Sequence, residues 1–263
     1  MMAAVAVVVV GATGAFFSDT ETSTGNTFTA GAIDLQIDNE SYAIDNTILN
    51  YPNPQGVLVA SEHTSWQLKD LTIEKFFDFV DLKPGDMGED TISLHVGSND
   101  AWLCASANIT SDLDNSITEP EDEVLLPNND GNDSTLGNGD LDSELKFMFW
   151  KDDGDNVLEY CGQNDTACVN NEISNIFING TLSDMGQQGG IALADSAGGI
   201  LGACNPIPGG STFWIGKAWC YGNLSANSVL QDNLGKTGSN GPLSDRGTGV
   251  TCGGSLAGNI GQT

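Results

Sequence analysis

The stretch FFSDTETSTGNTFTAGAIDLQID, residues 16–38, gives the clearest indication of the fold. Ile33, Leu35 and Ile37 alternate there with polar residues, and this period of two is typical of a β-strand with one buried face. Threonine and phenylalanine, which are frequent in strands, precede them. We therefore expect a strand over Thr27–Asp38, close to the start of a β-protein.

Further segments with the composition of strands follow, each bounded by glycine, asparagine, aspartate or proline. Phe76–Leu82 and Thr91–Val96 flank the turn-forming sequence Lys83-Pro84-Gly85-Asp86, which predicts a hairpin-like unit. Because amphipathic helices are scarce, the sequence predicts an all-β fold, a single jelly-roll-like antiparallel β-sandwich over residues 16–263. The other expected strands are Ala101–Ile109, Leu145–Lys151, Asn156–Tyr160, Ile173–Ile178 and Ser211–Tyr221.

Two stretches lack the alternation that marks strands. Residues 111–143 are acidic and rich in asparagine and glycine, which predicts a long surface insertion with a short helical turn near Glu119–Leu125. Residues 183–210 are rich in glycine and alanine. We expect them to form a second loop insertion, over one end of the sandwich.

Residues 1–15 are predicted to be a signal peptide. Ala3–Val10 is an unbroken apolar run, and the small residues Gly11–Ala15 after it suit a signal peptidase. The run is shorter than the roughly 20 apolar residues of a membrane-spanning helix. No lysine or arginine precedes the run, so the basic n-region of a signal peptide is missing. We expect a secreted, extracellular or cell-surface protein that meets signal peptidase during export.

The C-terminal stretch Val250–Thr263, VTCGGSLAGNIGQT, reads as the approach to another strand. We expect that the chain as given lacks a final strand of the sandwich. The same explanation, an incomplete sequence, accounts for the missing basic residues before Met1.

The charge balance constrains the partners. The chain has 36 acidic and 8 basic residues, which makes nucleic acid an implausible partner and makes cations natural ones. The alternative is a solvated acidic surface that keeps an exported protein soluble. Six cysteines, an even number, in an exported chain predict that all of them pair in disulfides. Cys161 and Cys168 close a short polar loop and are the expected pair, and the other candidates are Cys104, Cys204, Cys220 and Cys252.

A group of oxygen-bearing residues surrounds Gly154. Calcium takes 6 to 8 oxygen ligands in flexible geometry, and Asp152, Asp155 and Asn156 are the candidate ligands, with Glu159 nearby. The spacing differs from that of an EF-hand, and the alternative is a plain β-hairpin turn, for which Asp-Gly is a common signal. No other cofactor is expected. Candidate glycosylation sites with the N-x-[ST] pattern are Asn39, Asn108, Asn132, Asn164, Asn179 and Asn223.

Short motifs in both halves of the chain resemble one family. An aromatic-Ser-Asp start after the apolar leader, the sequence Thr27–Leu35 and the Asp81–Asp86 turn match the pattern of the TasA/camelysin (CalY) group, and Phe149–Glu159 and Phe213–Leu224 resemble segments of its larger members. The resemblance implies a jelly-roll-like secreted subunit with a SipW-type signal peptide. It also implies assembly into extracellular fibres, pili or biofilm matrix.

We expect the released N-terminus to act in that assembly. An extended segment can complete the open sheet edge of a neighbouring copy. The donor segment would begin with Phe16, Phe17, Ser18 and Asp19, whose aromatic side chains would fill pockets of the neighbour. The alternative is that this segment is the first strand of its own sheet.

Two other classes of function compete with a fibre subunit. Camelysin-type relatives are classed as metallopeptidases, but the histidines here are His63 and His95 alone, with no HExxH pair, so we expect no enzyme. His95 is expected to point away from the face that holds Leu94 and Val96. The remaining alternative is a calcium-dependent adhesive surface domain.

Overall fold

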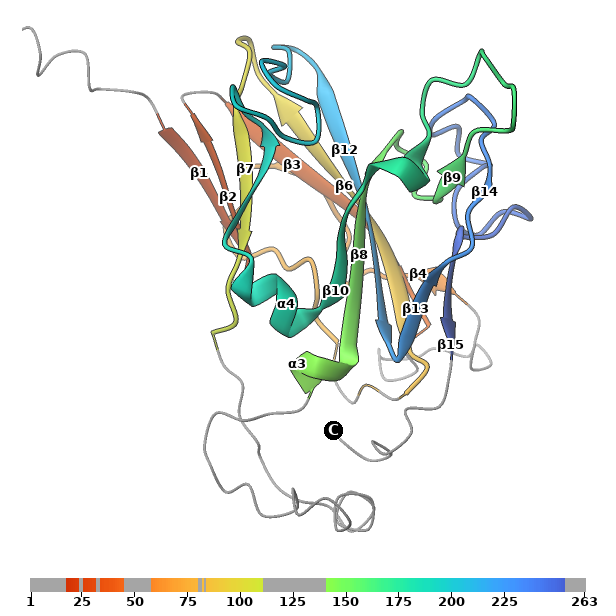
Figure 1. Cartoon of the computed structure of the whole chain (residues 1–263). Coiled ribbons are helices and arrows are strands. Elements are labelled where there is room, and N and C mark those ends of the chain that lie inside the picture. The colour runs from red at the N-terminus through yellow and green to blue at the C-terminus, as the bar shows by residue number, and fades with distance from the viewer. Residues whose placement is uncertain are drawn as a thin grey trace, which may run out of the picture.

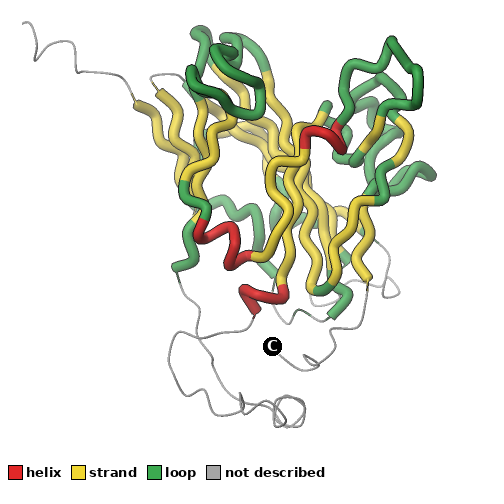
Figure 2. Tube along the Cα trace, in the orientation of Figure 1, coloured by secondary structure: helices red, strands yellow, loops and turns green. Residues whose placement is uncertain are grey.

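The computed structural model describes residues 18–23, 26–31, 34–44, 58–79, 82, 84–110 and 141–253. Over these ranges the chain consists mainly of strands in antiparallel sheets, which confirms the all-β class and the β-sandwich (Figure 2). The described helical segments are short: α3 (Leu141–Glu144), the 3-10 helix η2 (Glu172–Asn175) and α4 (Leu182–Gln187). None of them is long and apolar enough to cross a membrane.

The larger sheet has the strand order β10-β8-β12-β6-β3-β4, and β5 also pairs with β3 (Figure 1). Its strands are β3 (Leu35–Ala43), β4 (Val59–Ala60), β5 (Trp66–Lys69), β6 (Met87–Val96), β8 (Leu145–Asp152), β10 (Ile176–Thr181) and β12 (Thr212–Tyr221).

The smaller sheet has the order β1-β2-β7-β11. Its strands are β1 (Ser18–Ser23), β2 (Asn26–Gly31), β7 (Leu103–Ala107) and β11 (Gly190–Ala194). Two further pairs complete the described strands: β13 (Asn223–Ala226) with β15 (Val250–Gly253), and β9 (Glu159–Tyr160) with β14 (Val229–Leu230). The jelly-roll order of connections stays a prediction.

The main core lies between the two sheets. Leu35 of β3, Leu94 of β6 and Ile215 of β12 belong to one buried cluster with Leu103 of β7 and Leu193 of β11. Each such side chain contributes about 1.5–3 kcal/mol when fully buried. The alternating burial along β3 shows how the period of two selects the core face.

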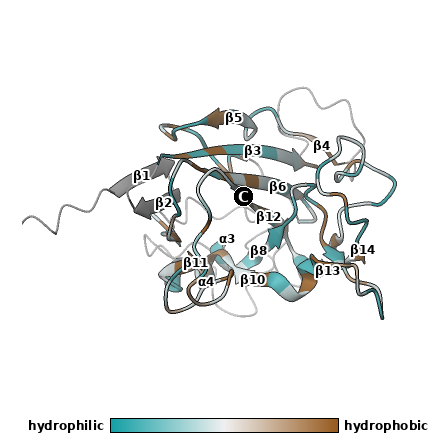
Figure 3. Ribbon diagram, turned by 90° about the horizontal axis from the view of Figure 1, so that it is seen from above, coloured by the Kyte–Doolittle hydropathy of each residue, from teal (hydrophilic) through white to brown (hydrophobic). Residues whose placement is uncertain are grey.

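The other face of the larger sheet is covered by the C-terminal part of the chain. Figures 1 and 3 show β8 and β12 lying between the smaller sheet and the strands β13 and β14. A separate cluster fills this side, with Trp150 of β8, Leu158 and Val250 among its buried members. The central strand β6 is therefore buried on both faces along most of its length.

The prediction of a single strand over Thr27–Asp38 is wrong. β2 ends at Gly31 and pairs with β7, whereas β3 begins at Leu35 and pairs with β6 in the other sheet. The chain thus changes sheets inside a stretch whose composition favours strand throughout. A continuous β-propensity does not reveal such a crossing, because both strands have the same local pattern.

The strand predicted over Phe76–Leu82 is absent from the residues described there. Phe77 and Phe79 instead pack on Trp219, with ring centroids 5.1 and 4.8 Å away. Their aromatic rings anchor an irregular segment at the end of the sandwich, and the residues described between 76 and 82 form no hairpin with β6. The Pro84–Gly85 turn does precede β6, and Gly85 has a φ of 96° that suits glycine.

Residues 183–210, predicted as a loop, hold most of α4 and all of β11. A capping box starts the helix, since Thr181 and Asp184 each accept a hydrogen bond from the other's backbone NH. β11 then pairs with β7 and supplies Leu193 to the core. Residues 111–140, including the helical turn expected at Glu119–Leu125, lie outside the described residues.

Candidate metal centre

Six carboxylates gather where the loop after β8 meets β9, η2 and the segment after β14. Figure 1 shows β9 and β14 side by side at this end of the molecule. Oxygen atoms of these residues form three groups, each with its members within 4.8 Å of one another. The groups are Asp152 with Asp153 and Asp155, Asp153 with Glu159 and Glu172, and Asp155 with Glu159 and Asp232.

Asp152, at the end of β8, shapes the loop that follows. Its Oδ1 accepts a hydrogen bond of 3.0 Å from the indole of Trp150, and its Oδ2 accepts bonds of 2.8 and 3.1 Å from the amides of Gly154 and Asn156. β8 and β9 do not pair with each other, so the loop is not the hairpin turn that was the alternative interpretation. Asp152 therefore stabilises this turn by accepting hydrogen bonds from its backbone amides.

Arg246 neutralises one of the three groups. Its Nη1 lies 3.1 Å from Asp155 Oδ2 and 3.0 Å from Asp232 Oδ2, while Nη2 pairs with Glu159 Oε1. Nη2 also donates to the backbone oxygen of Leu230 at 2.8 Å. The guanidinium thus ties the C-terminal segment to β9.

The third group, Asp153, Glu159 and Glu172, has a different environment. Glu172 accepts hydrogen bonds from the amide of Asp153 at 2.9 Å and the amide of Glu159 at 3.1 Å. Asn170 donates a third bond to it at 2.8 Å. Asp153 Oδ1 and Glu159 Oε2 are buried oxygens without a hydrogen-bond partner. This group therefore has free, converging acceptor atoms.

Burial dominates the electrostatics of the cluster. Burial, with the negative charges of Asp152 and Asp153 adding to it, raises the pKa of Glu172 to about 11. Burial likewise raises the pKa of Asp155 to about 8, with the neighbouring carboxylates Asp152 and Asp153 adding to the effect. Desolvation penalises the charged form, so the cluster as it stands favours a neutralising proton or cation.

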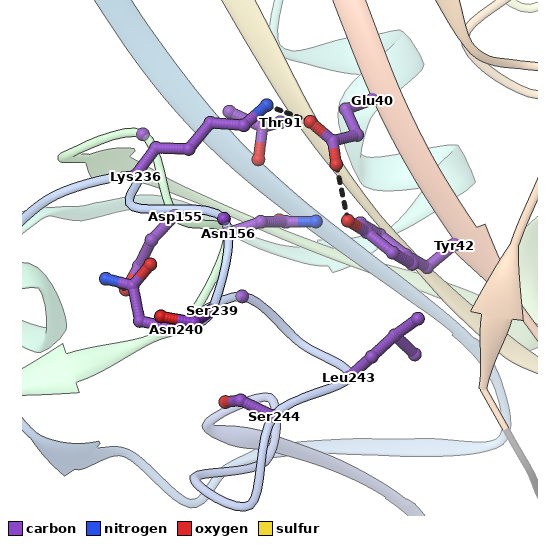
Figure 4. A pocket seen from close by; sticks show the side chains of 13 residues that line it. Glu40, Tyr42, Thr91, Asp155, Asn156, Lys236, Ser239, Asn240, Leu243 and Ser244 are labelled. Carbon is purple, nitrogen blue, oxygen red and sulfur yellow. Dashed lines mark hydrogen bonds and ion pairs between the residues drawn. The ribbon is translucent and has the colours of Figure 1, made fainter.

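The structure brings the predicted ligands Asp152, Asp155 and Asn156 into one loop, and their role as calcium ligands stays a prediction. Asp152 and Asp155 bond to protein donors, and Asn156, with a φ of 62°, extends its amide toward Tyr42 (Figure 4). The sequence analysis missed the roles of Glu172, Asp232 and Arg246, which are distant in sequence. The predicted disulfide Cys161–Cys168 was the one sequence signal for Glu172. It brings the chain that follows Cys168, which contains Glu172, close to the chain that precedes Cys161.

A cavity of about 250 Å³ adjoins the cluster. In Figure 4, Glu40 joins two sides of it by pairing with Lys236 and accepting a bond of 2.5 Å from the hydroxyl of Tyr42. Asn156 lines this cavity, is 2% exposed, and makes no hydrogen bond through its amide oxygen or nitrogen. Asn240 links cavity and cluster through a 3.2 Å hydrogen bond to Asp155.

The disulfide predicted between Cys161 and Cys168 is confirmed, with Cα atoms 5.7 Å apart. A second disulfide joins Cys220 of β12 to Cys252 of β15. The expectation that all six cysteines pair is wrong, because Cys104 and Cys204 are free and exposed. An even count allows full pairing but does not place the thiols in reach of each other.

Asn39 is not a glycan acceptor in the folded chain, because it is 3% exposed and donates a 2.6 Å bond to Thr64 O. Four other N-x-[ST] sites are exposed, whereas Asn132 lies outside the described residues; the exposed ones are Asn108, Asn164, Asn179 and Asn223. His95 is engaged by Asp38 at 2.9 Å and Thr212 at 3.1 Å, on the face opposite Leu94.

The predicted donor segment is described in part. Ser18 and Asp19 belong to β1 and pair with Gly31 and Ala30 of β2. In this structure β1 is therefore the first strand of its own sheet, which is the arrangement of the alternative interpretation. Phe16 and Phe17 lie outside the described residues.

The resemblance to the TasA/camelysin group rests on short motifs, and the family assignment stays a prediction. No protein-family model, curated protein or solved structure matches this chain.

Proposed function

We propose that this chain is a secreted structural subunit of extracellular fibres, pili or biofilm matrix, which assembles by donating its N-terminal strand to a neighbouring copy. The observation that carries the proposal is the position of β1. It is an edge strand of the smaller sheet and pairs with β2 alone among the described strands. An edge strand can be exchanged between copies without rearranging the rest of a sheet.

The composition of β1 favours exchange. Its sequence, SDTETS, contains only polar and charged residues. Release of β1 from β2 therefore breaks backbone hydrogen bonds but exposes no large apolar side chain of β1 itself. The same strand of another copy offers β2 an identical set of partners, from Ser18 opposite Gly31 to Ser23 opposite Asn26. Exchange of identical elements is a low-cost route to assembly.

Other features fit an extracellular location. The two disulfides are compatible with an oxidising compartment. A net charge of −28 disfavours nucleic acid as a partner, and it makes copies repel one another at low ionic strength. Assembly is therefore expected to accelerate when salt screens this repulsion.

Inter-chain cross-linking tests the exchange directly. Thr20 of β1 lies opposite Thr29 of β2, so chains with Thr20→Cys alone are mixed with chains that carry Thr29→Cys alone. Both variants also carry Cys104→Ser and Cys204→Ser, which remove the free thiols. After assembly and mild oxidation, the proposal expects disulfide-linked heterodimers on a denaturing gel.

The matched control mixes Thr20→Cys chains with chains that carry Thr72→Cys, an exposed position after β5. It should give only background cross-linking. Electron microscopy of the same samples reports whether filaments are present. Filaments without the Thr20–Thr29 link, or no filaments at any salt concentration, would reject strand donation.

A second candidate, a calcium-dependent adhesive domain, is favoured by the cavity beside the carboxylate cluster. Tyr42 offers an aromatic ring, and Asn156 offers an amide whose hydrogen-bonding groups are unused, which together suit a neutral saccharide. Glycan binding with and without chelator tests this candidate. Binding that survives Asn156→Ala would show that this cavity is not responsible.

A further inference from the structure

We propose that Asp153, Glu159 and Glu172 hold a calcium ion that fastens the loop after β8 to β9 and η2. Oxygens of the three carboxylates lie within 4.8 Å of one another. Glu159 and Glu172 are each 0% exposed, whereas Asp153 lies at the partly exposed rim. Cation binding here is independent of strand donation by β1, because the three residues belong to a different part of the fold.

In the two other carboxylate groups, protein donors already bind the carboxylates that are not shared with this group. In one, Asp152 accepts three hydrogen bonds from Trp150, Gly154 and Asn156. In the other, the guanidinium of Arg246 contacts Asp155, Glu159 and Asp232 and replaces a metal ion as the counter-charge. The group of Asp153, Glu159 and Glu172 is the one in this cluster that contains both Asp153 and Glu159, each of which has a buried oxygen without a hydrogen-bond partner.

Unused oxygens point to an occupant of this group. Glu159 binds Arg246 through Oε1, while its Oε2 has no hydrogen-bond partner although the side chain is fully buried. Asp153 Oδ1 is likewise buried and without a partner, whereas its Oδ2 accepts from Gln231 at 3.1 Å. A buried carboxylate oxygen without a partner is costly. A cation between the three carboxylates removes this cost at Asp153 and Glu159.

The donor set selects the type of cation. The group offers carboxylate oxygens and neither histidine nor cysteine, which favours a hard cation over zinc or copper. Magnesium usually retains several waters and binds through one or two carboxylates, whereas calcium accepts more protein oxygens at flexible geometry. A buried group of three carboxylates therefore suits calcium better.

The disulfide Cys161–Cys168 pre-organises this group. It lies between Glu159 and Glu172 in sequence, and it holds the Cα atoms of its cysteines 5.7 Å apart. The amide of Cys161 also donates a 2.9 Å bond to Asn171, next to Glu172. Two of the three ligands are thus held near each other before a cation arrives, which lowers the entropic cost of binding.

Calorimetric titration of the chelator-stripped chain with calcium chloride tests the proposal. We expect one calcium per chain, and binding at least about tenfold weaker after Glu172→Gln, because ligand charge sets affinity in such sites. Magnesium and zinc are titrated in parallel. Terbium, a luminescent calcium substitute, reports the location, because Trp150 next to Asp152 can sensitise it.

Two further variants make the outcome decisive. Asp153→Asn changes a rim residue and should weaken binding without unfolding the chain, and Glu62→Gln, in the exposed turn after β4, is the matched control that should bind normally. Calcium should raise the midpoint of thermal unfolding of the wild type, and it should raise that of Glu172→Gln much less. Absence of calcium binding by the folded chain, preference for another metal, or equal affinity in all variants would overturn the assignment.

Discussion

The ammonium group of Lys217 forms an ion pair with Asp90, directly opposite it on the neighbouring strand, and the exposed fractions of the two side chains are 3% and 0%. Lys217 also donates to the backbone oxygen of Phe76, and Ser41 donates a 2.6 Å bond to Asp90. The larger sheet thus contains a charged pair shielded from water. In such an environment each charge depends on its partner.

We expect Lys217→Met to lower the free energy of unfolding by about 3–5 kcal/mol, because the Asp90 carboxylate would be left buried without a counter-charge. Urea denaturation at neutral pH measures the change. Lys75→Met, which breaks the exposed 2.8 Å ion pair with Asp78, is the control and should cost less than about 1 kcal/mol. Similar losses in both variants would contradict this account. Adding Asp90→Asn to Lys217→Met should recover part of the loss.

Gly216→Ala should also destabilise the chain. Gly216 of β12 lies opposite Trp150 of β8, and a Cβ atom there would overlap the indole ring. Overpacking of this kind costs about 1–3 kcal/mol. Thermal denaturation tests the expectation, and Gly253→Ala, where a Cβ meets nothing within 4 Å, is the control. A wild-type midpoint in Gly216→Ala would show that the indole moves aside freely.

The cysteines predict different thiol counts before and after reduction. The native chain should expose two reactive thiols, Cys104 and Cys204, and the reduced and unfolded chain should expose six. Titration with a thiol reagent before and after reduction gives both numbers. Cys104→Ser with Cys204→Ser should abolish the native signal. A native count of zero would mean that these two cysteines are linked.

The stability contribution of Glu74 should depend on pH. Partial burial acts to raise the pKa of Glu74, but Lys69 and the amides of Thr72 and Ile73 outweigh it and lower the pKa to about 2. A depressed carboxyl pKa stabilises the fold above the unfolded value near 4.5, and the stabilisation disappears as the pH falls toward 2.

Glu74→Gln should therefore be less stable than wild type at pH 7, by less than about 1 kcal/mol for such a surface group. The difference should narrow between pH 5 and about 3. Denaturation curves of both chains across this range measure it, with Glu62→Gln as an exposed control. A difference that stays constant with pH would show that the charge of Glu74 is unimportant.

The sequence predicted those parts of the fold that depend on local pattern. The alternation around Leu35 and Leu94 identified core-facing strands, and Pro84-Gly85 identified a turn. It failed where long-range packing decides. Phe77 and Phe79 have strand propensity but are held in an irregular segment by Trp219, a residue that sequence patterns do not place beside them.

The same limit applies to the carboxylate cluster. Asp152 and Asp155 were recognised because they adjoin a glycine in one acidic run. Glu172 and Arg246 reach the cluster through contacts distant in sequence, with the amide of Glu159 and with Asp155. No spacing rule links them, since their separation reflects the length of intervening loops rather than the geometry of a motif.

The disulfide between Cys220 and Cys252 has a mechanical consequence. When the chain is pulled from its ends, tension passes through the covalent link and bypasses the segment between the two cysteines. Their sequence separation is 32, so about 100 Å of extended chain is withheld from stretching, at roughly 3.3 Å per residue. The bypassed segment includes Asp232 and Arg246. The region around Arg246 is therefore shielded from a force that unfolds the rest of the chain.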